Sequence, residues 1–160
     1  MQQKQSGIRV LFLDYDGVVN TLMWNEAGTK CTYNHPEDGK VNNFQAVQWV
    51  SEFCQKYKYD IVVTSTWRRF ENWRECLING GLRKGINIIG CTDIMNDKRG
   101  KEIKRYLEQH PEIKHYIIVD DEAYGILPEQ KKYLVETNGS VGFGITELYK
   151  CMDIYYEEKK

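Results

Sequence analysis

Two aspartates, Asp14 and Asp16, follow directly on a short apolar run, residues 8–13. A run of this length, rich in branched and aromatic residues and stopped by polar ones, is typical of a buried strand. Carboxylates two residues apart at the end of a strand point the same way, and buried together they repel unless they hold a cation or share a proton. One could act as a nucleophile and the other as a proton donor; the alternative is an Asp-rich turn that merely ends the strand.

Polar residues end two further apolar runs in the same way. A Thr-Ser-Thr sequence begins at Thr64, after residues 61–63, and Asp120 and Asp121 come after residues 116–119. In open α/β sheets, ligands bind at the edge where the carboxyl ends of the strands meet. Three polar clusters at three strand ends therefore favour a functional role for the first aspartate pair.

The elements that must position these groups alternate along the chain. Weaker strand patterns cover residues 86–89 and 133–135, and apolar residues recur at helical spacing in four other segments. These segments are residues 44–53, 71–79, about 100–109, and those from Thr146, a candidate helix cap, onward. The alternation predicts an α/β fold, a three-layer Rossmann-like parallel sheet with helices on both faces.

Bulk properties narrow the class of protein. The 160 residues predict a single domain, with residues 1–6 and 157–160 frayed at its ends. A net charge of −1 argues neither for nor against nucleic acid or membrane as a partner. The cysteines are odd in number and form no Cys-x-x-Cys pair, which favours reduced thiols. Because no apolar run reaches membrane-spanning length and no signal peptide is evident, we expect a cytoplasmic protein.

The ordered motifs resemble those of the haloacid dehalogenase-like superfamily, whose members are mostly phosphatases with an aspartyl-phosphate intermediate. Residues 14–20 match the first motif, Thr64 the second, and Asp120 and Asp121 the fourth. The third motif, a Lys or Arg at the start of a helix, is matched within residues 98–101.

Two strings, residues 64–68 and 99–103, are similar to those of a subgroup found as phosphatase-like domains in RNA-repair proteins and as stand-alone proteins.

The resemblance implies a Mg²⁺ cofactor held by carboxylates. Asp14 would be both nucleophile and metal ligand, and the backbone carbonyl of Asp16 a further ligand. Asp121 is the first choice for the remaining carboxylate ligand, with Asp120 close behind. The Asp16 side chain would protonate the leaving oxygen and then activate water, which requires a raised pKa. A second acid also argues against a literal dehalogenase, because a halide leaves without a proton.

Other residues are candidates for binding the phosphoryl group, namely Thr64, Ser65, Arg68, Lys98 and Arg99. The Thr64 hydroxyl could instead satisfy a neighbouring backbone group. Arg68 could bind phosphate through two hydrogen bonds, or simply pack along a helix start. The balancing cation is open among Arg99, Lys98 and Lys101, since the subgroup pattern favours Arg99 and the wider superfamily more often uses Lys.

The size of the substrate follows from what covers the site. Residues 20–41 and 64–98 are too short for the cap domain that many superfamily members carry, so we expect an open site with a minimal or absent cap. Residues 68–105 hold ten Lys or Arg and five Asp or Glu, a local excess that could bind backbone phosphate or be merely solvated. Trp24 and Trp67 could stack a base there, or pack against the core.

The leading functional hypothesis is a Mg²⁺-dependent phosphomonoesterase acting on an RNA or DNA end, with a 3′-phosphate favoured. The alternatives are a small-molecule or nucleotide phosphatase, a phosphoprotein phosphatase, a phosphotransferase, and a phosphate-binding regulatory module without turnover. No membrane partner is expected, and the sequence leaves the oligomeric state open.

Overall fold

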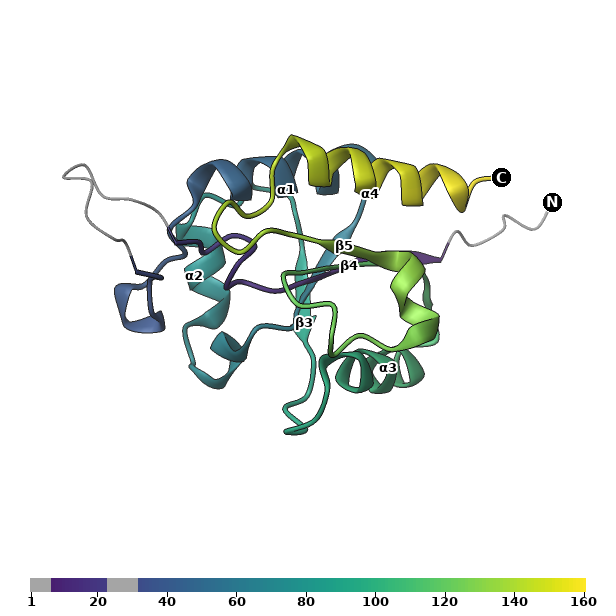
Figure 1. Ribbon diagram of the computed structural model, residues 1–160, viewed down its shortest axis with the longest axis horizontal. Coiled ribbons are helices and arrows are strands. Elements are labelled where there is room, and N and C mark those ends of the chain that lie inside the picture. The colour runs from purple at the N-terminus through teal and green to yellow at the C-terminus, as the bar shows by residue number, and fades with distance from the viewer. Residues whose placement is uncertain (1–6, 23–31) are drawn as a thin grey trace.

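A computed structural model describes residues 7–22 and 32–160. Its centre is a five-stranded, all-parallel sheet in the order β3-β2-β1-β4-β5 (Figure 1). The strands are β1 (Ile8–Leu13), β2 (Asp60–Val63), β3 (Ile88–Cys91), β4 (Ile113–Asp120) and β5 (Leu134–Glu136). The predicted α/β class and parallel Rossmann-like sheet are confirmed.

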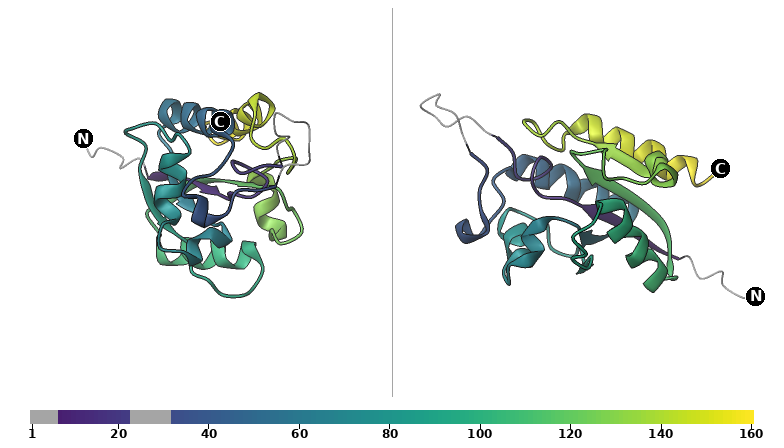
Figure 2. Two further views of the ribbon diagram at one scale, coloured as in Figure 1. Left: turned by 90° about the vertical axis from the view of Figure 1, so that its left-hand side faces the viewer. Right: turned by 60° about the horizontal axis from the view of Figure 1, so that its bottom comes forward.

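The helices are close to the predicted segments. They are α1 (Phe44–Tyr57), α2 (Trp73–Asn79), α3 (Arg99–Gln109) and α4 (Ile145–Glu157), with short 3-10 turns η1 (Pro36–Asp38), η2 (Thr66–Arg69) and η3 (Pro128–Tyr133). Helices α1 and α4 cover one face of the sheet and α3 the other, as Figure 2 shows from two further sides. None of the helices in the described ranges is both long and apolar enough to cross a membrane.

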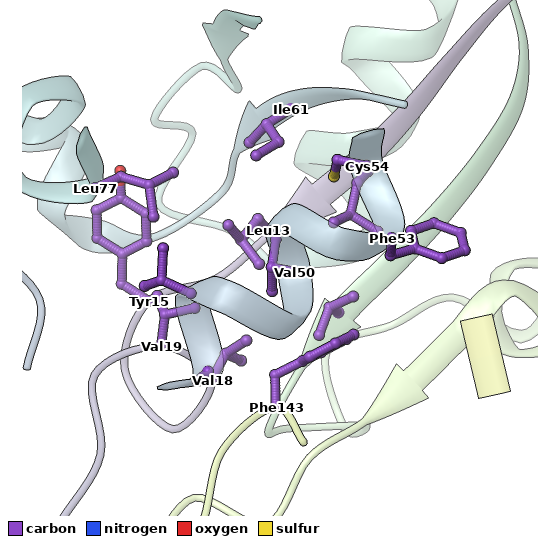
Figure 3. Close-up of a cluster of buried hydrophobic side chains, with 14 of the residues drawn as sticks. Leu13, Tyr15, Val18, Val19, Val50, Phe53, Cys54, Ile61, Leu77 and Phe143 are labelled. Atoms are coloured by element: carbon purple, nitrogen blue, oxygen red, sulfur yellow. The ribbon is translucent and has the colours of Figure 1, made fainter. Parts of the chain in front are cut away.

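The alternation of side chains along β1 creates the two cores. Leu11 and Leu13 point into the cluster beneath α1 and α4, whereas Val10 and Phe12 point into a second cluster with Ile103 of α3. Figure 3 shows side chains of the first cluster. With both faces covered, the central strand β1 is buried from Val10 to Leu13, its carboxyl end.

Strand register brings the predicted polar clusters to one edge. Leu13 pairs with Val63 on one side and with Val119 on the other. Each of these three residues is followed directly by a polar one, namely Asp14, Thr64 and Asp120. These polar residues are therefore neighbours across the sheet. The strand order also reverses between β1 and β4, which is the switch point where open α/β sheets bind ligands.

One prediction about the carboxyl-terminal helix needs correction. Helix α4 begins at Ile145 rather than being capped by Thr146, because the Glu147 carboxylate accepts the Gly144 N–H at 2.8 Å. Helix α4 continues to Glu157, and the Glu158 carboxylate lies 2.9 Å from His115 Nδ1, while the fraying of residues 157–160 stays a prediction. Residues 1–6 lie outside the described part of the chain.

The described residues build no cap domain over the carboxyl edge, as expected. Between β1 and α1 they contain only the turn after β1, η1 and irregular chain, with residues 23–31 outside the described part. Between β2 and α3 they contain η2, α2 and β3.

Candidate active site

Three carboxylates meet at the switch point. Asp14 follows β1, Asp120 ends β4 and Asp121 comes next, and each offers an oxygen within 4.8 Å of the others. Asp14 and Asp120 are buried, while Asp121 is half-buried. The sequence left Asp120 and Asp121 as alternatives, and the structure brings both to Asp14.

One arginine faces this acidic cluster. Arg99 Nη1 lies 3.1 Å from Asp14 Oδ1 and 2.8 Å from Asp120 Oδ2, and it donates to Thr64 Oγ1 at 3.3 Å. The other two candidate cations point elsewhere. Lys98 lies over the Tyr124 ring, and Lys101 pairs with Asp97 on the surface. Helix α3 therefore presents its first residue, Arg99, to the carboxylates.

Burial makes the acidic cluster hard to ionise. It raises the pKa of Asp14 to about 7; Arg99 opposes the rise and the neighbouring carboxylates add to it. Burial and Asp120 raise the pKa of Asp121 to about 6, and burial also raises that of Asp120. Burial alone would lower the pKa of Arg99, but the charges of Asp14 and Asp120 outweigh it and raise that pKa.

The carboxylate oxygens of Asp14, Asp120 and Asp121 fit a small divalent cation. Three ionised carboxylates beside one arginine leave an excess of two negative charges, which a divalent ion would offset. Oxygen-only donors with carboxylate charge are the set that Mg²⁺ prefers, whereas zinc and copper sites draw on His or Cys.

Asp16 stands apart from the three carboxylates and is held separately. Its Oδ1 accepts hydrogen bonds from Asn20 Nδ2 at 2.7 Å and from Trp67 Nε1 at 3.1 Å. Asn20 is itself buried and fixed, because its side-chain oxygen accepts the Asn42 N–H and its amide also donates to the Asn34 carbonyl. With Oδ1 occupied by two donors, Oδ2 is the oxygen of Asp16 that can carry a proton.

Gly17 allows the chain to turn between these groups. Its φ is +79°, in the region that favours glycine, and a Cβ at this position would lie 2.2 Å from Asp121 Oδ2. Its carbonyl accepts a hydrogen bond from Thr137 Oγ1 at 2.7 Å. The tight turn is thus tied to the end of β5 and leaves room for the Asp121 carboxylate.

Of the two roles predicted for Arg68, phosphate binding and packing at a helix start, the contacts in the structure favour the second. Arg68 is buried, and its guanidinium pairs with the buried Glu102 at 2.7 Å. Its other hydrogen bonds go to four backbone carbonyls, those of Thr64, Ser65, Thr92 and Asp93. All five N–H donors of the side chain are therefore engaged within the fold.

Thr64 and Ser65 are both buried at the end of β2, but their hydroxyls face different neighbours. The Thr64 hydroxyl contacts Arg99 within the site. The Ser65 hydroxyl instead accepts the Trp67 N–H at 3.2 Å and caps η2.

Of the two alternatives for Trp67, packing against the core is confirmed, and its burial excludes stacking on a base. The ring is buried, packs edge-on against Tyr15, and directs its N–H at Asp16. Trp24, the other candidate for stacking, lies outside the described residues.

Sequence reasoning assigned no role to Asn20, Trp67 and Glu102 as hydrogen-bonding partners of site residues. Asn20 carried a usable signal, since it is a polar residue after two valines in the same short motif as Asp16. The other two partners come from distant segments, and no local spacing links them to the residues they hold.

A comparison with protein families adds evidence independent of this geometry. Residues 10–147 match the family described as the HAD domain in Swiss Army Knife RNA repair proteins. The chain belongs to this family. The RNA-repair HAD family is thus the subgroup that the sequence motifs resembled, and the matched residues include all four motifs. A search of curated proteins found no match.

Proposed function

We propose that the protein is a Mg²⁺-dependent phosphomonoesterase that works through an aspartyl-phosphate intermediate. The observation that carries the proposal is the placement of Asp14, a buried carboxylate beside Arg99 and within 4.8 Å of two further carboxylates. An anionic nucleophile approaches an anionic phosphate only where positive charge offsets their repulsion. Arg99 supplies one such charge, and the acidic cluster can hold another.

Asp14, Asp120 and Asp121 would hold the Mg²⁺ ion, which when bound supplies positive charge to the nucleophile and the phosphoryl oxygens. The Thr64 hydroxyl and the Arg99 guanidinium, which contact each other, would bind and orient the phosphoryl group. Membership of the family supports this assignment of roles.

The chain's own residues then account for both steps of hydrolysis. The Asp14 carboxylate attacks phosphorus, the bond from phosphorus to the ester oxygen breaks, and Asp16 gives its proton to the leaving oxygen. In the second step Asp16 removes a proton from water, which attacks the phosphoaspartate and releases inorganic phosphate. Because Asn20 and Trp67 fix Oδ1 of Asp16, the proton is carried at Oδ2 in both steps.

The favoured substrate is a polynucleotide end, with the 3′-phosphate as the first choice. Relatives are described as domains of RNA repair proteins, and the described residues place no cap domain over the site. An uncapped edge leaves room for a long chain beyond the phosphate.

The free state of Cys54, Cys76, Cys91 and Cys151 supports the further prediction that the protein works in the cytoplasm.

The test is phosphate release with Mg²⁺, with and without a chelator. The substrates are a 3′-phosphorylated oligoribonucleotide, its 5′ counterpart, a mononucleotide, a phosphopeptide and glycerol phosphate. We expect fastest release from an oligonucleotide end, none after chelation, and none from a folded Asp14→Asn variant, which lacks the nucleophile. Faster turnover of the mononucleotide would indicate a nucleotidase, and faster turnover of the phosphopeptide a protein phosphatase. Substantial activity in Asp14→Asn would refute the mechanism.

A further inference from the structure

A pocket of about 380 Å³ opens beside the acidic cluster and shares Arg99 and Asp120 with it. Arg99 touches the nucleophile Asp14, so whatever fills the pocket lies one side chain away from the reacting phosphate. The volume falls in the range of small-ligand sites. The proposed mechanism uses only Arg99 and Asp120, the inner wall of the pocket. The outer wall, which includes Arg69, Lys98 and Tyr124, has no role in that mechanism.

The outer wall presents an exposed aromatic ring. Tyr124, in the loop after β4, is 86% exposed, the largest exposure among the large hydrophobic and aromatic side chains of the described residues. Lys98 lies 5.3 Å from the ring centroid, as expected for a cation over one face of the ring. The exposure leaves the other face free, and a flat π surface of this kind binds a nucleic-acid base without regard to sequence.

The same wall carries exposed positive charge. Arg69 and Lys98 both line it, and Arg69 is oriented by a hydrogen bond from Nη2 to Asn96 Oδ1 at 2.8 Å. The acidic residues of the wall are mostly engaged: Glu102 pairs with Arg68, Asp97 with Lys101, and Asp120 with Arg99. Two exposed cations on the same wall as an exposed ring match the alternation of phosphate and base along a single strand.

We propose that this pocket receives the nucleotide adjoining the cleaved phosphate, with its base stacked on Tyr124 and Arg69 and Lys98 beside the strand's backbone phosphates. The inference rests on the proposed function and names the subsite that would select nucleic acid. A peptide substrate has no flat base at the corresponding position, so Tyr124 distinguishes the two classes of macromolecule.

The test compares an oligonucleotide bearing a terminal phosphate with one whose terminal nucleoside is abasic. For the wild type we expect kcat/KM to be about tenfold or more lower on the abasic end, the loss of one stacked base. Tyr124→Ala should lose the same factor on the normal end and little more on the abasic one, while Tyr124→Phe should behave as wild type. Tyr149→Ala is the matched control, since Tyr149 is also an exposed tyrosine, at 58%. It lies on α4, which covers the face of the sheet opposite to α3.

Binding separates this inference from the proposed function. In an Asp14→Asn background with Mg²⁺, fluorescence anisotropy of labelled normal and abasic oligonucleotides should show the same dependence on Tyr124 without any turnover. The stacking subsite would be overturned if the normal and the abasic oligonucleotide were both hydrolysed and Tyr124→Ala changed neither rate, or changed both rates equally. Either result would leave the phosphatase intact. Base-dependent binding lost in Tyr124→Ala, together with no hydrolysis by the wild type, would overturn the phosphatase and support the subsite.

Discussion

At the scale of single residues, the orientation of Asp16 depends on two neighbours. Asn20 and Trp67 both donate to the same oxygen, at 2.7 and 3.1 Å. Neither donor can accept in return, so the arrangement holds the carboxyl group in one orientation, and its second oxygen accepts no hydrogen bond from the described residues. Proton transfer by Asp16 would therefore need no rearrangement of the side chain during the reaction.

We predict that Asp16→Asn separates the two chemical steps. Para-nitrophenol leaves without a proton, so Asp14 should still be phosphorylated by para-nitrophenyl phosphate, whereas the second step lacks its base. Rapid mixing should then show a burst of about one equivalent of nitrophenolate, followed by turnover roughly 10²- to 10⁴-fold slower than wild type. Steady turnover near the wild-type rate, without a burst, would contradict the role of Asp16.

The limits of sequence reasoning are clear at this scale. Asp14, Asp120 and Asp121 could be predicted because they end or follow buried strands, and parallel strands bring such positions together. The choice among Lys98, Arg99 and Lys101 could not, since it depends on which residue of the first turn of α3 faces the sheet. The burial of Trp67 and Arg68 depends on segments distant in sequence, which local patterns do not report.

At the scale of elements, the turn after β1 is a tight fit. Gly17 and Gly39 both have positive φ, +79° and +77°, but only at Gly17 would a Cβ meet other atoms, those of the Asp121 carboxylate. The two glycines therefore share a backbone conformation and differ in what surrounds them.

This difference predicts the outcome of a matched pair of substitutions. Gly17→Ala and Gly39→Ala should each lose about 1–2 kcal/mol of stability from the left-handed backbone. Only Gly17→Ala should also displace Asp121, so only it should weaken Mg²⁺ binding, measured by calorimetry, by tenfold or more. Equal Mg²⁺ affinity in both folded variants would show that Asp121 does not depend on the space beside Gly17.

The junction of η2, β3 and α3 depends on the buried pair of Arg68 and Glu102. We predict that Arg68→Ala costs about 3–5 kcal/mol of unfolding free energy, because it removes the ion-pair partner of the buried Glu102 and the side-chain hydrogen bonds to several carbonyls. The control is Arg83→Ala, whose pair with Glu52 is 37% and 47% exposed and should cost no more than about 1 kcal/mol. Denaturant unfolding measures both, and similar losses would contradict the structural role of Arg68.

At the scale of the whole molecule, the packed sheet holds together charges that would otherwise separate. The register of β1 with β2 and β4 aligns Asp14, Thr64 and Asp120, and helix α3 adds Arg99 from a fourth segment. Both faces of the sheet are covered, so the carboxylates cannot move apart into water without breaking the core. The fold therefore tolerates an unfavourable cluster of like charges, and its stability should respond to anything that neutralises them.

The response to pH follows from the sign of the shifts. Burial raises the folded-state pKa of Asp14 from 3.8 to about 7 and that of Asp121 from 3.8 to about 6. At a pH between the unfolded and the folded pKa of each group, the folded protein therefore holds more protons than the unfolded chain. Without metal, the contribution of these groups to stability is therefore fully present below the unfolded pKa and is lost as pH rises to about 7. Mg²⁺ binds only the ionised carboxylates, so its stabilising effect has the opposite dependence and grows with pH.

We therefore predict a larger rise of Tm on adding Mg²⁺ at about pH 8 than at about pH 5. A metal-free Asp14→Asn variant should lose less stability than wild type over the same rise in pH, because its side chain cannot ionise. Differential scanning calorimetry on matched samples with Mg²⁺ or chelator tests both statements. A Mg²⁺ effect that is equal at the two pH values would mean that the ion binds outside this cluster, since only buried, proton-competing carboxylates couple metal binding to stability in this way.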